Sequence, residues 1–245
     1  MKEMKLSNRT IGRMLGALIL LAFVVYGGGT ALVDSGSGAP AVLSNVADNQ
    51  MQISAGALMI LLNSVVVASI GVLAFPVLRQ HHTISAYAYL ITRVFEAVML
   101  AAGALGLLLL IPLSREYAVA GAGDASVLPA LARVAQDGNQ NAYHFAMIFL
   151  GLGRLLFCRV LWQARLVPRF MAVWGMVGYA IVAAGMMLEV LGYGLGLALW
   201  IPGGLFEVAL GVLLLVKGFP AGQSRDRDEQ TSVSSKISEV VVAGR

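Results

Sequence analysis

The chain has 245 residues, of which 58% are hydrophobic and only 12% are charged, and its formal net charge is +4 at pH 7. Soluble domains are about 45–50% apolar and about 25% charged, so this composition excludes an ordinary water-soluble protein and favours one that lies in lipid. The basic residues stand at the ends of apolar runs rather than together on a soluble domain, which argues against binding to nucleic acid.

Six stretches of the chain meet the requirement for a membrane-crossing helix, which is about 20 mostly apolar residues. No stretch alternates with a period of two, as the strands of a membrane barrel would. The sequence therefore predicts an all-α integral membrane protein, a bundle of six transmembrane helices within residues 10–217. The predicted helices cover residues 10–29, 54–78, 84–113, 141–162, 170–191 and 195–216.

The connections between these helices differ in length. Residues 79–83 and 163–169 are short links, which predict antiparallel packing of the helices that they join. The longer connection, residues 114–140, contains apolar positions at helical spacing over 127–135, and this pattern predicts a short helix lying at the membrane interface. The tail, residues 218–245, is polar and rich in serine, and we expect it to be disordered.

The distribution of lysine and arginine predicts the orientation. With residues 1–9 in the cytoplasm, the inner segments hold 13 basic residues, whereas the outer loops hold 2, Arg115 and Arg133. Cytoplasmic loops carry the excess of Lys and Arg, so both termini are expected in the cytoplasm. The first helix could instead be a cleaved signal peptide, but its long apolar run and the poor cleavage site at residues 27–29 favour retention.

Five ionisable residues fall inside the predicted spans: Arg93, Glu96, Arg154, Glu189 and Glu207. Each costs about 2.5–3.5 kcal/mol near the bilayer centre on insertion scales, so such residues face the bundle interior, pair with one another or serve a function. Arg93 and Glu96 are three residues apart on one helix and can pair directly. Arg154 and Glu207 reach similar depths on other helices, so we predict one buried cluster of Arg93, Glu96, Arg154 and Glu207.

Two interpretations of this cluster remain open. Ion pairs between helices can fix their register without binding anything, whereas carboxylates in membrane interiors also mark pathways for solutes, ions or protons. Three further residues are secondary polar candidates. Glu189 lies near the outer end of its helix and fits an interfacial position, Asn63 fits a hydrogen bond between helices, and His144 lies on the same helical face as Arg154.

Other candidate sites are weak. His81 and His82 form a pair in a short inner loop, with no cysteine or carboxylate nearby to complete a metal site. Cys158 is the only cysteine and cannot form an intrachain disulfide. No serine stands in a nucleophile elbow and no aspartate-rich motif is present. The sequence therefore predicts no metal, no cofactor and no enzymatic activity.

A short internal similarity raises the possibility of a repeat. Residues 95–98 read Phe-Glu-Ala-Val and residues 206–209 read Phe-Glu-Val-Ala, each in the third predicted helix of its half. Three helices per half would give the halves opposite orientations, as in inverted-repeat transporters. Chains rich in Ala, Val, Leu and Gly also produce such matches by chance.

Four stretches of the chain have a familiar order and spacing. They are residues 9–16, residues 86–100 with Arg93 and Glu96, residues 166–169, and Phe206-Glu207 followed by residues 213–219. In these stretches the sequence resembles the bacterial membrane proteins grouped as domain of unknown function 4386. The resemblance implies a multi-pass bacterial membrane protein and carries over no activity, cofactor or catalytic residue.

Two functions from different classes are consistent with the sequence. The favoured one is a structural, regulatory or accessory protein of the bacterial plasma membrane, with the lipid bilayer and a second copy or another membrane protein as partners. The alternative is a small-solute or proton-coupled transporter with Glu96 and Glu207 at a midplane site. The first predicts a tightly packed polar cluster, and the second predicts a water-filled cavity that reaches one of the glutamates.

Overall fold

The computed structural model describes residues 7–38, 41–119 and 127–220, and the regular structure in them is helical. Six of the described helices are long and apolar enough to cross a membrane, which confirms the predicted all-α architecture. They are α1 (Asn8–Gly36), α3 (Gln50–His81), α4 (Thr83–Val119), α5 (Leu128–Gln163), α6 (Arg169–Val190) and a last segment, Ala198–Lys217, formed by the 3₁₀ helix η1 (Leu197–Trp200) and α7 (Ile201–Lys217).

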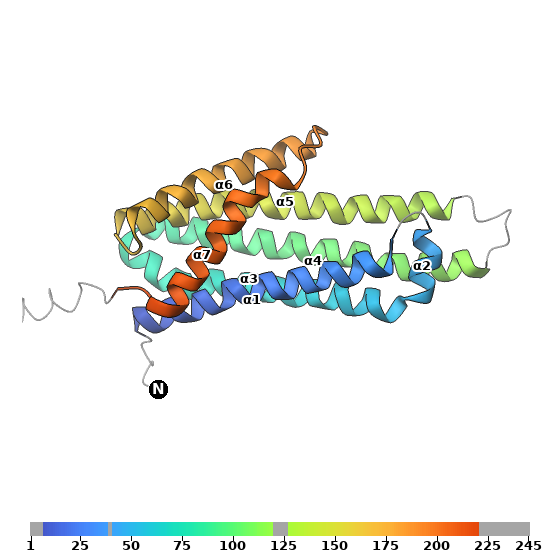
Figure 1. Cartoon of the computed structure of the whole chain (residues 1–245), viewed down its shortest axis with the longest axis horizontal. Coiled ribbons are helices and arrows are strands. Elements are labelled where there is room, and N and C mark those ends of the chain that lie inside the picture. Colours follow the sequence, from blue (N-terminus) through green and yellow to red (C-terminus); the bar gives the residue numbers. More distant parts are fainter. Residues whose placement is uncertain (1–6, 39–40, 120–126, 221–245) are drawn as a thin grey trace, which may run out of the picture.

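Successive helices pack against one another, and the last helix returns to the first. The order of contact is α1 with α3, then α4, then α5, then α6, and α7 lies against both α6 and α1. Figure 1 shows α7 crossing obliquely over the long helices, with its end beside the start of α1. A side chain joins these ends, since Arg13 donates to the carbonyl of Val216. Asn8 at the start of α1 also donates to Gln80 at the end of α3.

Glycines bring helix backbones into direct contact at two crossings. Gly12 and Gly16 of α1 lie against the backbone at the end of α7, and Gly29 of α1 lies against Gly56 of α3. Lipid supplies no hydrophobic force between helices, so membrane helices depend on close packing through small residues. These crossings hold α1 between α3 and α7.

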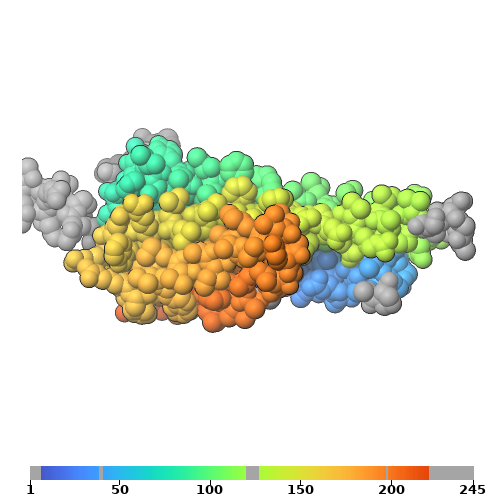
Figure 2. Space-filling view, turned by 90° about the horizontal axis from the view of Figure 1, so that it is seen from above, coloured from blue at the N-terminus to red at the C-terminus, as the bar shows by residue number. Residues whose placement is uncertain are grey.

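The long helices extend well beyond the spans expected from hydropathy. At about 1.5 Å per residue, the 37 residues of α4 measure about 55 Å, against a hydrocarbon core of about 30 Å. Figure 2 shows α6 and α7 covering only part of this length, with the start of α5 and the region of the seven-residue α2 (Val42–Asp48) continuing beyond them. A second apolar core, including Val46, Ile53 and Leu110, fills this end.

The start of α5 differs from the prediction. The separate interfacial helix expected over residues 127–135 is instead the first part of one continuous helix that begins at Leu128. The polar run from Gln136 to Asn141 lowers hydropathy but contains no proline and one glycine, so it does not end the helix. Residues 221–245, which hold most of the predicted tail, lie outside the described residues.

Candidate functional site

The first ion pair of the site lies within one helix. Arg93 and Glu96 follow one another at i,i+3 on α4, and Arg93 Nη1 lies 2.7 Å from a carboxylate oxygen of Glu96. Both belong to the buried stripe of α4, together with Tyr89 and Leu100, so the pair faces other helices. Gly71 of α3 lies directly against the stem of Arg93, so α3 can cover it closely.

The second ion pair joins two helices that are distant in sequence. Arg154 of α5 donates from Nη2 to Oε1 of Glu207 on α7. Arg154 shares the buried stripe of α5 with Met147, Leu150, Gly151, Phe157 and Cys158, and Glu207 follows Gly203, Gly204 and Phe206 on the buried side of α7. The apolar stripe of each helix therefore carries its charged residue into the bundle.

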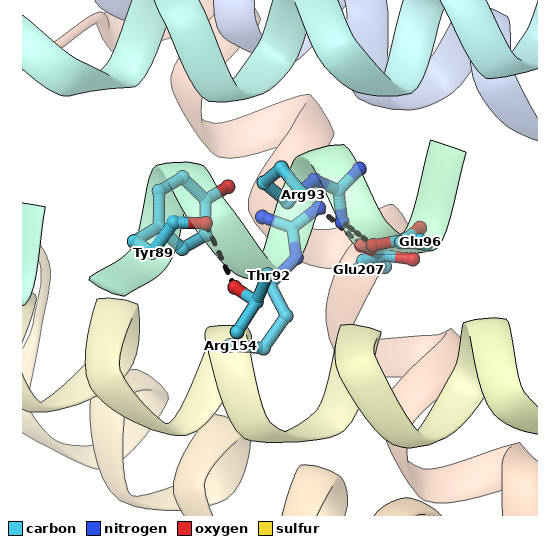
Figure 3. Close-up of polar contacts among 6 residues, drawn as sticks. All are labelled: Tyr89, Thr92, Arg93, Glu96, Arg154 and Glu207. Atoms are coloured by element: carbon cyan, nitrogen blue, oxygen red, sulfur yellow. Dashed lines mark hydrogen bonds and ion pairs between the residues drawn. The ribbon is translucent and has the colours of Figure 1, made fainter. Parts of the chain in front are cut away.

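The two pairs form one electrically balanced group. Figure 3 shows both ion pairs in one region of the bundle, with the guanidinium groups of Arg93 and Arg154 directed toward the carboxylates of Glu96 and Glu207. Glu96 interacts electrostatically with Arg154 and Glu207 as well as with Arg93. The exposed fractions are 1% for both arginines, 2% for Glu96 and 8% for Glu207. We call Arg93, Glu96, Arg154 and Glu207 the charge cluster.

Aromatic side chains surround the charge cluster. The guanidinium carbon of Arg154 lies 5.5 Å from the ring centroid of Phe157 and 6.0 Å from that of Tyr179. Tyr89 stacks on Phe157 with the centroids 5.1 Å apart, and Phe206 meets Tyr179 edge-on. Guanidinium groups are attracted to aromatic faces, more strongly where water is excluded. The rings of Phe157 and Tyr179 thus lie beside the Arg154 guanidinium.

Several polar atoms of this region have no hydrogen-bond partner among the described residues. They include Nε of Arg93, Nε and Nη1 of Arg154, and the hydroxyls of Tyr89 and Tyr179, all with almost no solvent-accessible surface. In Figure 3 the Tyr89 hydroxyl points toward the two guanidinium groups. A buried donor left without a partner costs about 1–3 kcal/mol. The charge cluster is therefore balanced in charge but has surplus hydrogen-bond donors.

Sequence reasoning did not single out Tyr89, Phe157 and Tyr179. The available signal was their helical spacing, because Tyr89 lies four residues before Arg93 and Phe157 lies three residues after Arg154. Tyr179 gives no such signal, because it comes to Arg154 from another helix, α6. Its role depends on how α6 packs on α5.

The secondary candidates lie apart from the ion pairs. His144 is buried, its Nε2 is hydrogen-bonded to Gln140, and its Nδ1 has no partner among the described residues. Asn63 is buried on α3, but its Oδ1 also lacks a partner there, so this oxygen does not make the expected bond between helices. Glu189 lies at the end of α6, where it accepts from the backbone N–H of Gly196.

His82, the second residue of the histidine pair, has a local role in the structure. The Nδ1 of His82 accepts a hydrogen bond from the backbone N–H of Ser85, in the first turn of α4. An unsatisfied N–H in the first turn of a helix takes a side-chain acceptor in this way. In residues 7–38, 41–119 and 127–220, no three residues of the types His, Cys, Asp and Glu are grouped so that they could hold a metal ion.

A cleft of about 330 Å³ lies between α2, the end of α4 and the start of α5, at the opposite end of the bundle from the start of α1 and the end of α7. Leu43, Tyr117, Ala132, Arg133 and Gln136 are among the residues that line it, and no member of the charge cluster is among them. The cleft therefore gives no access to Glu96 or Glu207.

Comparison with known families gives a match over most of the chain. A family described as "Domain of unknown function (DUF4386)" matches residues 14–218, which include all four residues of the charge cluster. No curated protein and no solved structure matches the chain. The resemblance seen in the sequence is thereby confirmed.

Proposed function

This chain belongs to the family described as domain of unknown function DUF4386, and from that premise we propose that it is a non-enzymatic protein of a bacterial plasma membrane with a structural, regulatory or accessory role. Its partners are the lipid bilayer and, through the outer faces of its helices, a second copy or another membrane protein. The observation that carries the proposal is the burial of two ion pairs in a packed region, with almost no solvent-accessible surface on their unpaired nitrogens.

The proposed role of the charge cluster is to fix the register of α7. The apolar contacts of α7 with α1 and α6 would allow α7 to slide along these helices, because small and aliphatic residues repeat along them. The Arg154–Glu207 bond specifies one position, since a shift of α7 by one turn of about 5.4 Å would leave two charges buried and unpaired. Such a bond selects one packing among several apolar alternatives.

We further propose that both termini lie in the cytoplasm. Support comes from the basic residues Arg9, Arg79, Arg165, Arg169 and Lys217, which lie at helix ends on the same side of the bundle. Arg115 and Arg133 belong to the opposite end, which has far fewer basic residues. The positive-inside rule then places the first group in the cytoplasm.

Proton flux through the purified full chain in proteoliposomes tests the non-transporting role. With a pH-sensitive dye inside, an imposed pH gradient is expected to decay at the rate of protein-free vesicles. A faster decay that disappears in Glu207→Gln, but persists in the matched control Glu189→Gln, would overturn the proposal in favour of a proton pathway. Vesicles must contain equal amounts of each variant.

The second candidate is a small-solute transporter centred on the charge cluster. It is favoured by the unpaired donors of Arg93 and Arg154, which offer hydrogen bonds that the described residues do not take. Against it stand the close packing around these donors and the position of the cleft at the other end of α4. A transporting state would require α7 to separate from α5.

A further inference from the structure

Only some of the hydrogen-bond donors of Arg154 have an acceptor in the part of the chain that the structure describes. A guanidinium has five N–H donors in a planar fork suited to two parallel bonds with one carboxylate. Here one nitrogen, Nη2, bonds to one oxygen of Glu207, while Nε and Nη1 have no partner among the described residues. Arg154 is therefore held by its glutamate at one point and retains the donors for a second contact.

The surroundings of Arg154 resemble a site for an acid with an apolar body. The rings of Phe157 and Tyr179 flank the guanidinium, and the hydroxyls of Tyr89 and Tyr179 are buried without partners among the described residues. Ligand sites commonly combine apolar and aromatic walls with a few polar groups that fix orientation. The fixed positive charge selects a carboxylate as the polar end of such a ligand.

We propose that Arg154 anchors a binding site for a small aliphatic monocarboxylate, which takes the place of the Glu207 carboxylate. The ligand carboxylate bonds to the fork of Arg154, and its alkyl part lies against Phe157 and Tyr179. The bond between Arg154 and Glu207 is then the ligand-free state of the site, in which a carboxylate of the protein occupies the position of the ligand carboxylate.

Charge balance determines how the exchange occurs. The ligand enters as the uncharged acid, its O–H bond breaks, and the proton forms a new O–H bond on the carboxylate of Glu207. The resulting anion pairs with Arg154, so two positive and two negative charges remain in the group, with Arg93 and Glu96 unchanged. No uncompensated charge is created in the bundle, and an uncompensated charge is the arrangement that costs most there.

The packing of α7 is compatible with this exchange. The backbone of α7 lies against α1 and α6, whereas its approach to α5 is slight, so the Arg154–Glu207 bond is a principal link between α5 and α7. The segment before α7 contains Gly192, Gly194 and Gly196 with positive φ, a conformation that glycine adopts without strain. Movement of Glu207 away from Arg154 therefore leaves the main contacts of α7 in place.

Equilibrium dialysis of radiolabelled butyrate against the full chain in nanodiscs tests the proposal. Saturable binding is expected for the wild-type chain, and butyramide, which lacks the charge, is not expected to compete. In Glu207→Gln the internal competitor for Arg154 is removed, so we expect butyrate to bind at least tenfold more tightly. Glu189→Gln, which changes a glutamate at the end of α6, is expected to bind as the wild type does.

Arg154→Gln alone leaves Glu207 buried without its partner and can fail to fold, so the double variant R154Q/E207Q provides the non-binding reference. It is expected to fold and to show only the partition of butyrate into lipid. Saturable binding to wild type and Glu207→Gln that is absent from the double variant supports the site. Equal uptake by wild type and double variant, or no saturable binding to either wild type or Glu207→Gln, overturns it.

Discussion

Arg154 and Glu207 are 53 residues apart in the chain, yet their side chains form an ion pair inside the bundle. The pair joins α5 to α7, whose backbones otherwise scarcely approach each other, because α7 packs mainly on α1 and α6. One polar bond thus supplies a connection that apolar packing provides elsewhere in the protein. The stability of the bundle should therefore be sensitive to changes in either partner.

We expect Arg154→Gln and Glu207→Gln each to lower the free energy of unfolding by about 3–5 kcal/mol, because each leaves one uncompensated charge in the interior. The double variant removes both charges and should recover most of this loss. Unfolding of the purified protein by SDS in mixed micelles measures all three variants. Losses that simply add in the double variant would show that the two residues do not act as a pair.

A second prediction concerns the crossing of α1 and α7. A Cβ added at Gly16 would meet the backbone at Gly211 and Leu215, which cannot move aside as a side chain can. Gly16→Ala should therefore destabilise the protein by about 1–3 kcal/mol through overpacking.

Gly27 provides the matched control in the same helix. A Cβ added there meets nothing within 4 Å, so Gly27→Ala should be neutral or stabilising by up to about 1 kcal/mol. Thermal unfolding in detergent compares the two variants. Equal effects of Gly16→Ala and Gly27→Ala would contradict the close crossing.

Much of this structure could be anticipated from the sequence because a bilayer permits few solutions. The cost of burying a charge in lipid identified Arg93, Glu96, Arg154 and Glu207 as residues that turn inward, and all four are buried in the structure. A count of residues along each helix was sufficient to predict that these four residues lie at similar depths.

Other features depend on information that hydropathy does not contain. The polar run from Gln136 to Asn141 continues α5 because it lacks a helix breaker, so hydropathy underestimated the helix. The pairing within the cluster depends on the oblique path of α7, and the contact of Tyr179 with Arg154 depends on how α6 packs on α5. The inverted repeat stays a prediction: Glu96 and Glu207 both belong to the charge cluster, but α4 has 37 residues and α7 has 17.

A third prediction concerns the link between α5 and α6. Arg165 has φ of 52°, and the N–H of Leu166 donates to the carbonyl of Leu161, which is the pattern of a helix end closed by a left-handed residue. A side chain in this conformation costs roughly 1 kcal/mol. Arg165→Gly should therefore raise the free energy of unfolding by up to about 1 kcal/mol.

The control for this prediction is Arg165→Ala, which removes the same charge but keeps the strained conformation. It should give no gain in stability. A similar gain in both variants, measured by SDS unfolding, would attribute the effect to the loss of the arginine side chain rather than to the backbone.

A fourth prediction tests the proposed orientation. Gln80 and Tyr117 are exposed residues near opposite ends of the bundle, whereas the native Cys158 is buried. In intact spheroplasts, a membrane-impermeant maleimide should label Tyr117→Cys, and it should label Gln80→Cys only after the membrane is permeabilised. The wild-type chain gives the background. The reverse pattern would place the termini outside.

The last prediction concerns Asn63, the buried amide whose Oδ1 has no partner among the described residues. A buried polar group without a hydrogen bond costs about 1–3 kcal/mol, and an apolar side chain of similar size avoids that cost. Asn63→Leu should therefore raise the free energy of unfolding by about 1 kcal/mol. If Asn63→Leu destabilises the protein instead, the amide contributes a contact that requires its polarity, and Asn63 should then be examined for binding.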